Sequence, residues 1–444
     1  MKRESTVKRE PNLHREPNLH REPNLHRDLN LYWAGQTAST FGSVLTGIAL
    51  PLVAVVEFRA SAGQLGLIGA AATLPVILLG LPAGALADRI TRPRRALLAL
   101  DTLSALVVGV VALGLARHAA SIGWLIALDV VQGAVATLLG SLYFVHLRQL
   151  VGAETIGAVR ARLQAGQFGA AMVARVLVGP VIAGFGGSAA LAVDAVSYLL
   201  SVLALLSMSA PTELPRGAGR DGSGSLRWAA GGLRFFAGHP FHRALLVFVA
   251  VPAASLAGVD ALTAPFLLRT VHVPTGAYGL AFVLSGAMGL TGSAVASRLL
   301  RPGRDPRQLV VAGFAGAMAC TPLLPLAAGP VPLATACAAL GIGLPVFFAA
   351  IANVALVTVF GVDVPEDAMG RTMAALYVLT ASAAMSGALA GGALGDALGV
   401  HPALWALDAA ALGAVALAAP WALRAARQLR EAAPASALPE AVQV

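Results

Sequence analysis

Three ionisable residues lie inside otherwise apolar stretches of the sequence: Asp129, Arg175 and Asp260. In lipid such groups are costly, so each needs a partner or a task. Counting about 1.5 Å per residue from the ends of their segments places Asp129 and Arg175 at a similar depth, so the two could pair. A carboxylate that leaves such a pair, or loses water when a cavity closes, changes its affinity for protons. Asp129 is therefore a candidate for proton coupling, and a permanent ion pair that only fixes helix packing is the alternative.

Other kinds of chemistry find little support in the sequence. It contains no recognisable Ser-His-Asp set, no Cys-His pair and no Walker-type phosphate loop, which argues against an enzyme and against ATP as the direct energy source. His146, His239 and His242 flank apolar segments, where we expect solvated roles. Cys320 and Cys337 lie inside such segments and behave as small hydrophobic residues. We expect no metal site and no cofactor.

Composition places most of the chain in a membrane. Of its 444 residues, 57% are hydrophobic and 12% are charged, and a soluble protein would need more polar residues to coat its surface. Nearly continuous apolar stretches argue against a membrane β-barrel, whose strands alternate apolar and polar residues. Lys2 and Lys8 are the only lysines, and no basic and aromatic surface motif for nucleic acid is present.

Apolar segments bounded by charges and turn residues predict twelve transmembrane helices. A long hydrophilic stretch follows the sixth, so we divide the chain into an N-terminal six-helix bundle (33–210), a central cytoplasmic loop (211–243), a C-terminal six-helix bundle (244–424) and a cytoplasmic tail (425–444). The twelve expected spans are 33–56, 64–87, 97–116, 122–144, 164–186, 189–209, 244–267, 276–297, 308–328, 332–360, 372–395 and 402–423.

Residues 1–32 differ from the rest. The hexapeptide Arg-Glu-Pro-Asn-Leu-His starts at Arg9, Arg15 and Arg21, and its recurring prolines disfavour a helix. We expect a disordered cytoplasmic tail, which could precede the functional start of the protein.

Arginines give the orientation. Most of them lie at both ends of the chain and in the connections that follow spans 2, 4, 6, 8 and 10. Arg59, Arg117 and Arg269 are in the other set of connections, on the opposite side of the membrane. The positive-inside rule then predicts a multi-pass protein of the inner (plasma) membrane with both termini in the cytoplasm.

The connection after the second span carries the most specific motif. It reads Gly84-Ala85-Leu86-Ala87-Asp88-Arg89, followed by Arg92. This pattern, between spans 2 and 3 of a six-plus-six protein, resembles the signature loop of the major facilitator superfamily. A simple basic stop-transfer cluster is the alternative, and it leaves Gly84 and Asp88 unexplained.

The fifth span contains Gly179-Pro180-Val181-Ile182-Ala183-Gly184, which resembles the antiporter motif of exporters in that superfamily. In span 4, Asp129 stands three residues before Gln132-Gly133, where the family motif has an arginine, so that arginine's role cannot be transferred. Segments 35–39, 194–198 and 365–371 resemble the drug:proton antiporter branch that includes macrolide-efflux proteins and enterobactin exporters.

The resemblance implies an all-α membrane fold of twelve helices in two pseudo-symmetric six-helix bundles. It also implies a central cavity bordered by spans 1, 2, 4, 5, 7, 8, 10 and 11. In that arrangement Asp129 and Asp260 face the cavity more plausibly than Asp101, Asp194 or Asp408, for which we expect structural roles. The polar groups expected in the apolar cavity wall are Gln36, Gln132, Gln167, Asn353 and Tyr377.

We therefore expect an exporter of hydrophobic or amphiphilic compounds, drug-like or macrolide-like, that works by alternating access. The proton gradient is its expected energy source, and the candidates for proton coupling are Asp129, Arg175 and Asp260. We expect Asp88 and Arg89 to control closure of the cytoplasmic side. The residues expected to shape span 5 are Gly179, Pro180 and Gly184. Export of a siderophore or another secreted metabolite is the alternative, and a membrane receptor or scaffold without transport is a third reading.

Overall fold

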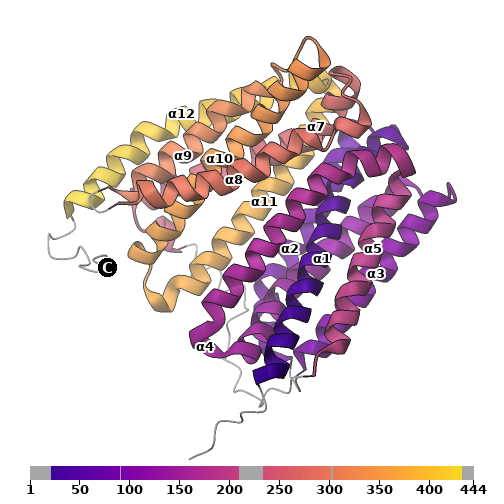
Figure 1. Cartoon of the computed structure of the whole chain (residues 1–444). Coiled ribbons are helices and arrows are strands. Elements are labelled where there is room, and N and C mark those ends of the chain that lie inside the picture. Colours follow the sequence, from indigo (N-terminus) through magenta and orange to yellow (C-terminus); the bar gives the residue numbers. More distant parts are fainter. Residues whose placement is uncertain (1–21, 91, 210–233, 302–303, 433–444) are drawn as a thin grey trace, which may run out of the picture.

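The computed structural model describes residues 22–90, 92–209, 234–301 and 304–432, and within these ranges some side chains, including those of 84–89, lie outside the description. The first half of the described chain forms one bundle (Figure 1). Its helices are α1 (Glu22–Val56), α2 (Ala62–Arg89), α3 (Pro93–Ala116), α4 (Ile122–Phe185) and α5 (Gly187–Ser207).

The second half forms the other bundle (Figure 1). Its elements are α7 (Pro240–Pro265), the π-helical turn η1 (Phe266–Thr270), the 3-10 turn η2 (Thr275–Ala277), α8 (Leu280–Leu299), α9 (Pro306–Cys320), the 3-10 turn η3 (Thr321–Leu323), α10 (Val331–Asp363), α11 (Glu366–Leu398) and α12 (Val400–Ala432).

Helix α4 has 64 residues and holds two membrane spans, 122–143 and 162–185. The chain doubles back between them, because both inner ends lie against the start of α1. The Tyr32 hydroxyl donates to the backbone oxygen of Tyr143 at 3.4 Å, and the Trp33 indole N–H donates to that of Arg162 at 3.2 Å. The predicted connection between spans 4 and 5 is thus helical rather than a loop.

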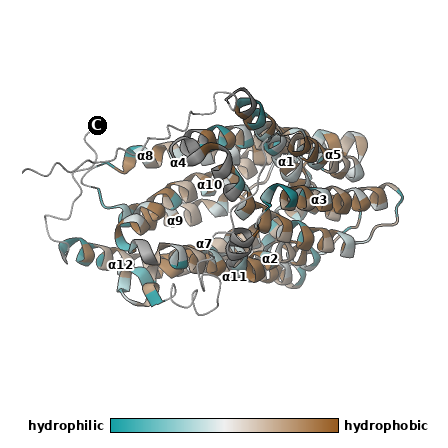
Figure 2. Ribbon diagram, turned by 90° about the horizontal axis from the view of Figure 1, so that it is seen from below, coloured by the Kyte–Doolittle hydropathy of each residue, from teal (hydrophilic) through white to brown (hydrophobic). Residues whose placement is uncertain are grey.

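The predicted all-α fold with two six-helix bundles is confirmed. Eleven described segments are long and apolar enough to cross a membrane. The remaining predicted span, 308–328, corresponds to α9 and η3, in which the α-helix is only 15 residues long. Figure 2 shows hydrophobic residues along most of the helices and hydrophilic residues gathered towards their ends.

Several boundaries differ from those expected. Helix α1 begins at Glu22, so residues 22–32 belong to a helix and not to a disordered tail. Pro23 sits in its first turn, where a backbone N–H has no partner within the helix and proline is tolerated. Helix α7 begins at Pro240 and α12 continues to Ala432, so both extend beyond the predicted spans. Residues 1–21, which hold most of the hexapeptide repeats, lie outside the described residues.

The packing of the two bundles differs between their ends. We call the face where α1 begins and α12 ends the terminal face, and the other the opposite face. Near the opposite face, one hydrophobic core runs through both bundles and includes Leu52, Leu128, Leu262 and Leu404. Near the terminal face each bundle has its own hydrophobic core. The core of the second bundle includes Phe248 and Phe360, and the core of the first includes Tyr32 and Leu142. The described bundles are therefore joined at the opposite face.

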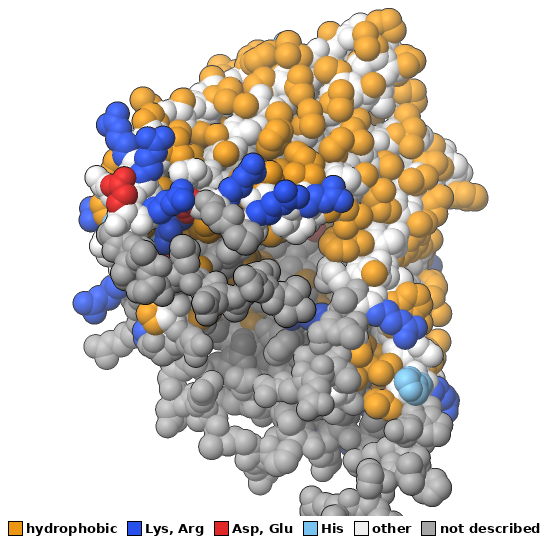
Figure 3. Space-filling view, turned by 60° about the vertical axis from the view of Figure 1, so that its left-hand side comes forward, with side chains coloured by type: hydrophobic (Ala, Val, Ile, Leu, Met, Phe, Trp, Pro, Cys, Tyr) orange, Lys and Arg blue, Asp and Glu red, His pale blue; other side chains and the backbone are white. Residues whose placement is uncertain are grey.

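The outer surface fits a lipid environment. Large hydrophobic side chains such as Leu106, Leu203 and Leu417 are more than half exposed. Figure 3 shows a broad hydrophobic surface that ends at a band of basic side chains. Exposed apolar helix faces with charges at their ends are typical of helices that cross a bilayer.

Candidate functional site

A cavity of about 280 Å³ lies between the two bundles. It combines polar and apolar groups from both halves of the chain. Its lining residues are Val44, Gly47, Ile48 and Pro51 of α1, Arg175 of α4, Asp260 of α7, Tyr278 just after η2, and Phe282 and Ser285 of α8.

Two opposite charges share this cavity. Arg175 is half-buried, and its guanidinium points towards α8, where Nη1 lies 3.6 Å from the position that a Cβ on Gly286 would take. Asp260 is exposed to the cavity. The two side chains form no ion pair within 4 Å, and neither has another charged partner within that distance among the described residues. Both charges are therefore available to protons, water or a charged ligand.

The rest of the cavity is fixed by packing. Tyr278 is 1% exposed and its ring lies 5.2 Å from that of Phe282. The Ser285 hydroxyl donates to the backbone oxygen of Phe282 at 2.6 Å. Gly47 has open space where a Cβ would stand, so the α1 wall leaves room beside the charges. A rigid wall next to two charges can position a ligand.

Close contacts between the bundles lie on the opposite-face side of this cavity. A Cβ on Gly179 of α4 would collide with the backbone of Gly276, and one on Gly279 would collide with the backbone oxygen of Arg175. The two bundles also contact each other between α2 and α11. There a Cβ on Gly66 would lie 3.1 Å from the Cα of Gly392. These small residues allow the helices to approach closely, as is typical of membrane interfaces.

Two polar contacts strengthen that closure. The Ser61 hydroxyl donates to Asp396 at 3.1 Å, which joins the start of α2 to the end of α11. Arg269 of η1 donates from Nη2 to the backbone oxygen of Val55 on α1 at 3.3 Å. Each links one bundle to the other. The molecule is thus closed at the opposite face.

The predicted motif residues fall in different surroundings. The side chains of Gly84, Asp88 and Arg89 lie outside the described residues, although the backbone of α2 continues through them. Arg92 is exposed at the N-cap of α3. Their predicted role in closure stays a prediction.

In span 5, the three motif residues differ in their contacts. Gly179 is buried against Gly276, whereas Pro180 is exposed. Gly184 is also exposed and has no neighbour within 4 Å of a Cβ position. Of the three, Gly179 is the one whose small size the observed packing requires.

The pairing of Asp129 with Arg175 does not occur in the described structure. Asp129 is half-buried and lies one turn before Gly133, which packs against the backbone oxygen of Ala72 on α2. Residues four apart share a helix face, so Asp129 lies on the side of α4 that faces α2. Arg175 instead reaches towards α8. A similar depth in the membrane does not bring two side chains together, because depth does not determine the direction in which each side chain points around its helix axis.

Two of the polar groups expected in the cavity wall are directed elsewhere. Gln132 donates from Nε2 to the Tyr198 hydroxyl at 3.1 Å, so it faces α5. Gln36 is 4% exposed and is buried within the first bundle. Gln167 is half-buried, while Asn353 is exposed.

Tyr377 is 64% exposed on α11, and its ring lies 4.0 Å from a Cβ position on Gly80 of α2. It therefore lies at the seam between the bundles. Neither Tyr377 nor any of the four residues above lines the cavity that holds Arg175 and Asp260.

A buried polar cluster inside the first bundle accounts for one of the structural carboxylates. Asp101 is fully buried and accepts hydrogen bonds from the Ser201 hydroxyl at 2.7 Å and the Tyr143 hydroxyl at 3.3 Å. It thereby joins α3, α4 and α5. Buried polar groups that are hydrogen-bonded in this way stabilise one arrangement of a core.

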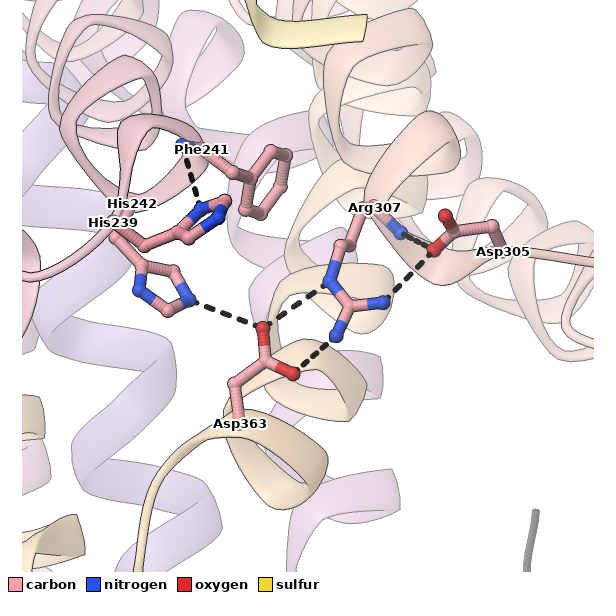
Figure 4. Close-up of polar contacts among 6 residues, drawn as sticks. All are labelled: His239, Phe241, His242, Asp305, Arg307 and Asp363. Atoms are coloured by element: carbon pink, nitrogen blue, oxygen red, sulfur yellow. Dashed lines mark hydrogen bonds and ion pairs between the residues drawn. The ribbon is translucent and has the colours of Figure 1, made fainter. Parts of the chain in front are cut away.

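Sequence reasoning missed a second cluster, at the terminal ends of α7, α9 and α10 (Figure 4). Arg307 makes a bidentate ion pair with Asp363, whose Oδ2 also contacts Nε2 of His242 at 3.1 Å. Asp305 caps α9 by accepting from the backbone N–H of Arg307 at 3.0 Å. The expected solvated role of His242 is therefore wrong.

The expectation for His146 is also wrong, because that side chain is fully buried, with its ring 5.7 Å from that of Tyr32. His239 caps the start of α7, where its Nδ1 accepts from the backbone N–H of Phe241 at 3.2 Å. The three histidines flank apolar segments in sequence, but the helices extend past those segments and enclose two of them.

Comparison with known proteins identifies the class. Residues 32–377 match the family model of the Major Facilitator Superfamily, so the chain belongs to that superfamily. It is a multi-pass membrane transporter. None of the curated proteins matches it.

Solved structures agree in fold at low sequence identity. The nucleoside transporter NupG is 13% identical with a TM-score of 0.68, over 90% of this chain and 98% of that one. A bacterial homologue of the iron transporter ferroportin in an inward-facing state is 16% identical with a TM-score of 0.66, over 90% and 99%. A bacterial homologue of the human lysosomal transporter Spinster, also inward-facing, is 16% identical with a TM-score of 0.66, over 94% and 98%. These likenesses concern the fold.

Proposed function

We propose that this protein exports a hydrophobic or amphiphilic compound by alternating access, driven by protons that move inward. The observation that carries the proposal is the cavity that Arg175 and Asp260 line from different bundles without forming an ion pair. A change in the distance between the bundles would change the environment of both charges. Such a change is what couples the proton affinity of a carboxylate to a conformational step.

The proposed orientation in the membrane rests on the arginines. They gather on the terminal face, and basic connections lie in the cytoplasm in membrane proteins. The described bundles are joined at the opposite face, and in the proposed orientation such a state would open to the cytoplasm. An exporter would load its substrate in this state.

The substrate class rests on the cavity wall. Val44, Ile48, Pro51 and Phe282 supply apolar surface beside the two charges. Arg175, Asp260, Tyr278 and Ser285 supply hydrogen-bonding groups in the same cavity, so a ligand that combines an apolar part with a polar or charged head would fit it. A cationic amphiphile would approach Asp260 in place of a proton.

The test uses purified protein in proteoliposomes with an internal pH dye. A panel of cationic, neutral and anionic amphiphiles, including siderophores, is added under a pH gradient. We expect at least one amphiphile to move protons in a manner that depends on the protein. The same compound should be excluded from efflux-deficient cells that express the protein.

Each negative result has a distinct meaning. Substrate flux without proton movement would contradict proton coupling. A response confined to siderophores would replace the drug-like substrate class with a secreted metabolite. Binding without flux of any compound, at any imposed gradient, would favour a receptor over a transporter.

A further inference from the structure

A second cavity, of about 690 Å³, is a groove on the outer wall of the first bundle, between α1, α4 and α5. On α1 it extends from Trp33 to Phe41, which is about 12 Å along a helix. We call it the acyl groove. Its lining residues are Trp33, Ala34, Thr37, Ala38, Phe41, Ala170, Val173, Ala192, Val193, Val196, Ser197 and Leu200.

The chemistry of the acyl groove is almost entirely apolar. Of its two hydroxyl groups, that of Ser197 is already used, since it donates to the backbone oxygen of Asp194 at 2.7 Å. Thr37 Oγ1 has no hydrogen-bond partner among the described residues. Val173, Val196 and Leu200 are exposed large hydrophobic residues on membrane-spanning helices. A hydrocarbon chain is the ligand that such a wall fits.

One end of the groove carries a positive charge. Arg162 is exposed, and its Cζ lies 5.6 Å from the centre of the Trp33 ring. Its Nη2 donates to the neutral side chain of Asn30 at 3.0 Å, and it has no ion pair with a carboxylate in the described part of the chain. Trp33 and Arg162 lie at the terminal end of their spans, where tryptophan and arginine sit at the level of lipid head groups.

We propose that the acyl groove binds one acyl chain of an anionic phospholipid whose phosphate pairs with Arg162. The groove supplies about 12 Å of apolar wall, and the guanidinium, which carries a charge without a carboxylate partner, stands at its head-group end. Arginine binds phosphate oxygens through two parallel N–H donors. This proposal stands apart from the proposed export function, because it concerns the outer wall of one bundle.

Trp33 offers a direct readout. In full-length protein in which Trp124, Trp228, Trp405 and Trp421 are replaced by phenylalanine, Trp33 is the remaining tryptophan. The protein is placed in dioleoyl-phosphatidylcholine vesicles that contain a small fraction of phosphatidylglycerol with brominated acyl chains. Bromine quenches tryptophan at short range. We expect stronger quenching of Trp33 than with the same fraction of brominated phosphatidylcholine, by about fivefold in apparent affinity.

Three variants of this protein separate the lipid site from general effects. Arg162→Gln should remove the preference for phosphatidylglycerol, whereas Arg427→Gln, which changes an exposed arginine on α12, should leave it intact. Ala192→Phe fills the groove from an exposed position and should reduce quenching by both lipids. Size-exclusion elution of each variant in detergent checks that it is folded.

The proposal is overturned if both brominated lipids quench Trp33 equally, or if Arg162→Gln behaves like Arg427→Gln. It is also overturned if an added amphiphile that the protein exports displaces the brominated lipid from Trp33, whereas added non-brominated phosphatidylglycerol does not. In that case the groove would be an entry site for substrate.

Discussion

Arg175 and Asp260 reach one cavity from opposite bundles, and neither is neutralised by an ion pair among the described residues. A charge pair within one bundle would move as a unit during alternating access. Because these two residues belong to different bundles, their separation has to change when the bundles rotate. We therefore propose Asp260, rather than Asp129, as the coupling carboxylate.

Replacing Asp260→Asn should abolish substrate accumulation driven by a pH gradient and should leave exchange of substrate across the membrane largely intact. The amide keeps the size of the side chain but cannot carry a proton into the cell. Asp129→Asn should keep pH-driven accumulation within about twofold of wild type, since Asp129 lies outside this cavity. Fluxes in proteoliposomes, with and without a gradient, measure both.

The reverse ranking, with loss of accumulation in Asp129→Asn and none in Asp260→Asn, would restore the prediction made from the sequence. Glu431→Gln, at the exposed end of α12, serves as the control for removal of a carboxylate.

Arg175→Gln should also uncouple transport, whereas Arg175→Lys should retain part of the accumulation. A positive charge beside Asp260 stabilises the carboxylate after its proton has left, and lysine preserves that charge while losing the guanidinium geometry. The accumulation ratio of a substrate from the panel measures the effect. If lysine and glutamine variants lose accumulation equally, the shape of the arginine matters more than its charge.

Gly179→Ala should favour opening at the opposite face. Its Cβ would meet the backbone of Gly276, and overpacking of this kind costs about 1–3 kcal/mol. The matched control is Gly184→Ala in the same helix, where a Cβ meets nothing within 4 Å. A cysteine introduced at Ile48, in a background without native cysteines, should react faster with an impermeant maleimide from the opposite face in Gly179→Ala.

Equal labelling rates in the two alanine variants would show that the contact between Gly179 and Gly276 does not hold the opposite face closed.

Asp363→Asn should destabilise the second bundle by about 3 kcal/mol, because it removes the bidentate partner of the half-buried Arg307 guanidinium and leaves only the longer ion pair with Asp305 at 3.5 Å. Adding Arg307→Gln to that variant should recover part of the loss, as expected for two residues that interact directly. Thermal unfolding in detergent measures both. Glu431→Gln, at an exposed carboxylate near the end of α12, is the control and should change stability little. Additive losses in the double variant would contradict the ion pair.

Much of the fold could be predicted from the sequence, because apolar length and arginine positions decide where helices cross a membrane. Asp260 and Arg175 were likewise identified, since an ionisable residue in an apolar segment is conspicuous. Their partners could not be predicted. The direction of a side chain around a helix depends on packing, and so Gln132 turned towards Tyr198 and Asp129 towards α2.

The cluster of His242, Arg307 and Asp363 was missed for a related reason. Its members are separated by 65 and 56 positions, counted from 242 to 307 and from 307 to 363, and each alone is typical of a solvated helix end. Only the arrangement of α7, α9 and α10 brings them together.

The hydrophobic core shared by the two bundles at the opposite face has a thermodynamic consequence. A state that opens at the opposite face must separate part of that core and expose it to water. Exposure of apolar surface to water raises heat capacity, so the equilibrium between the two states should follow a curved dependence on temperature. Transport rates measured over a wide temperature range should therefore depart from a straight Arrhenius line even where the protein stays fully folded.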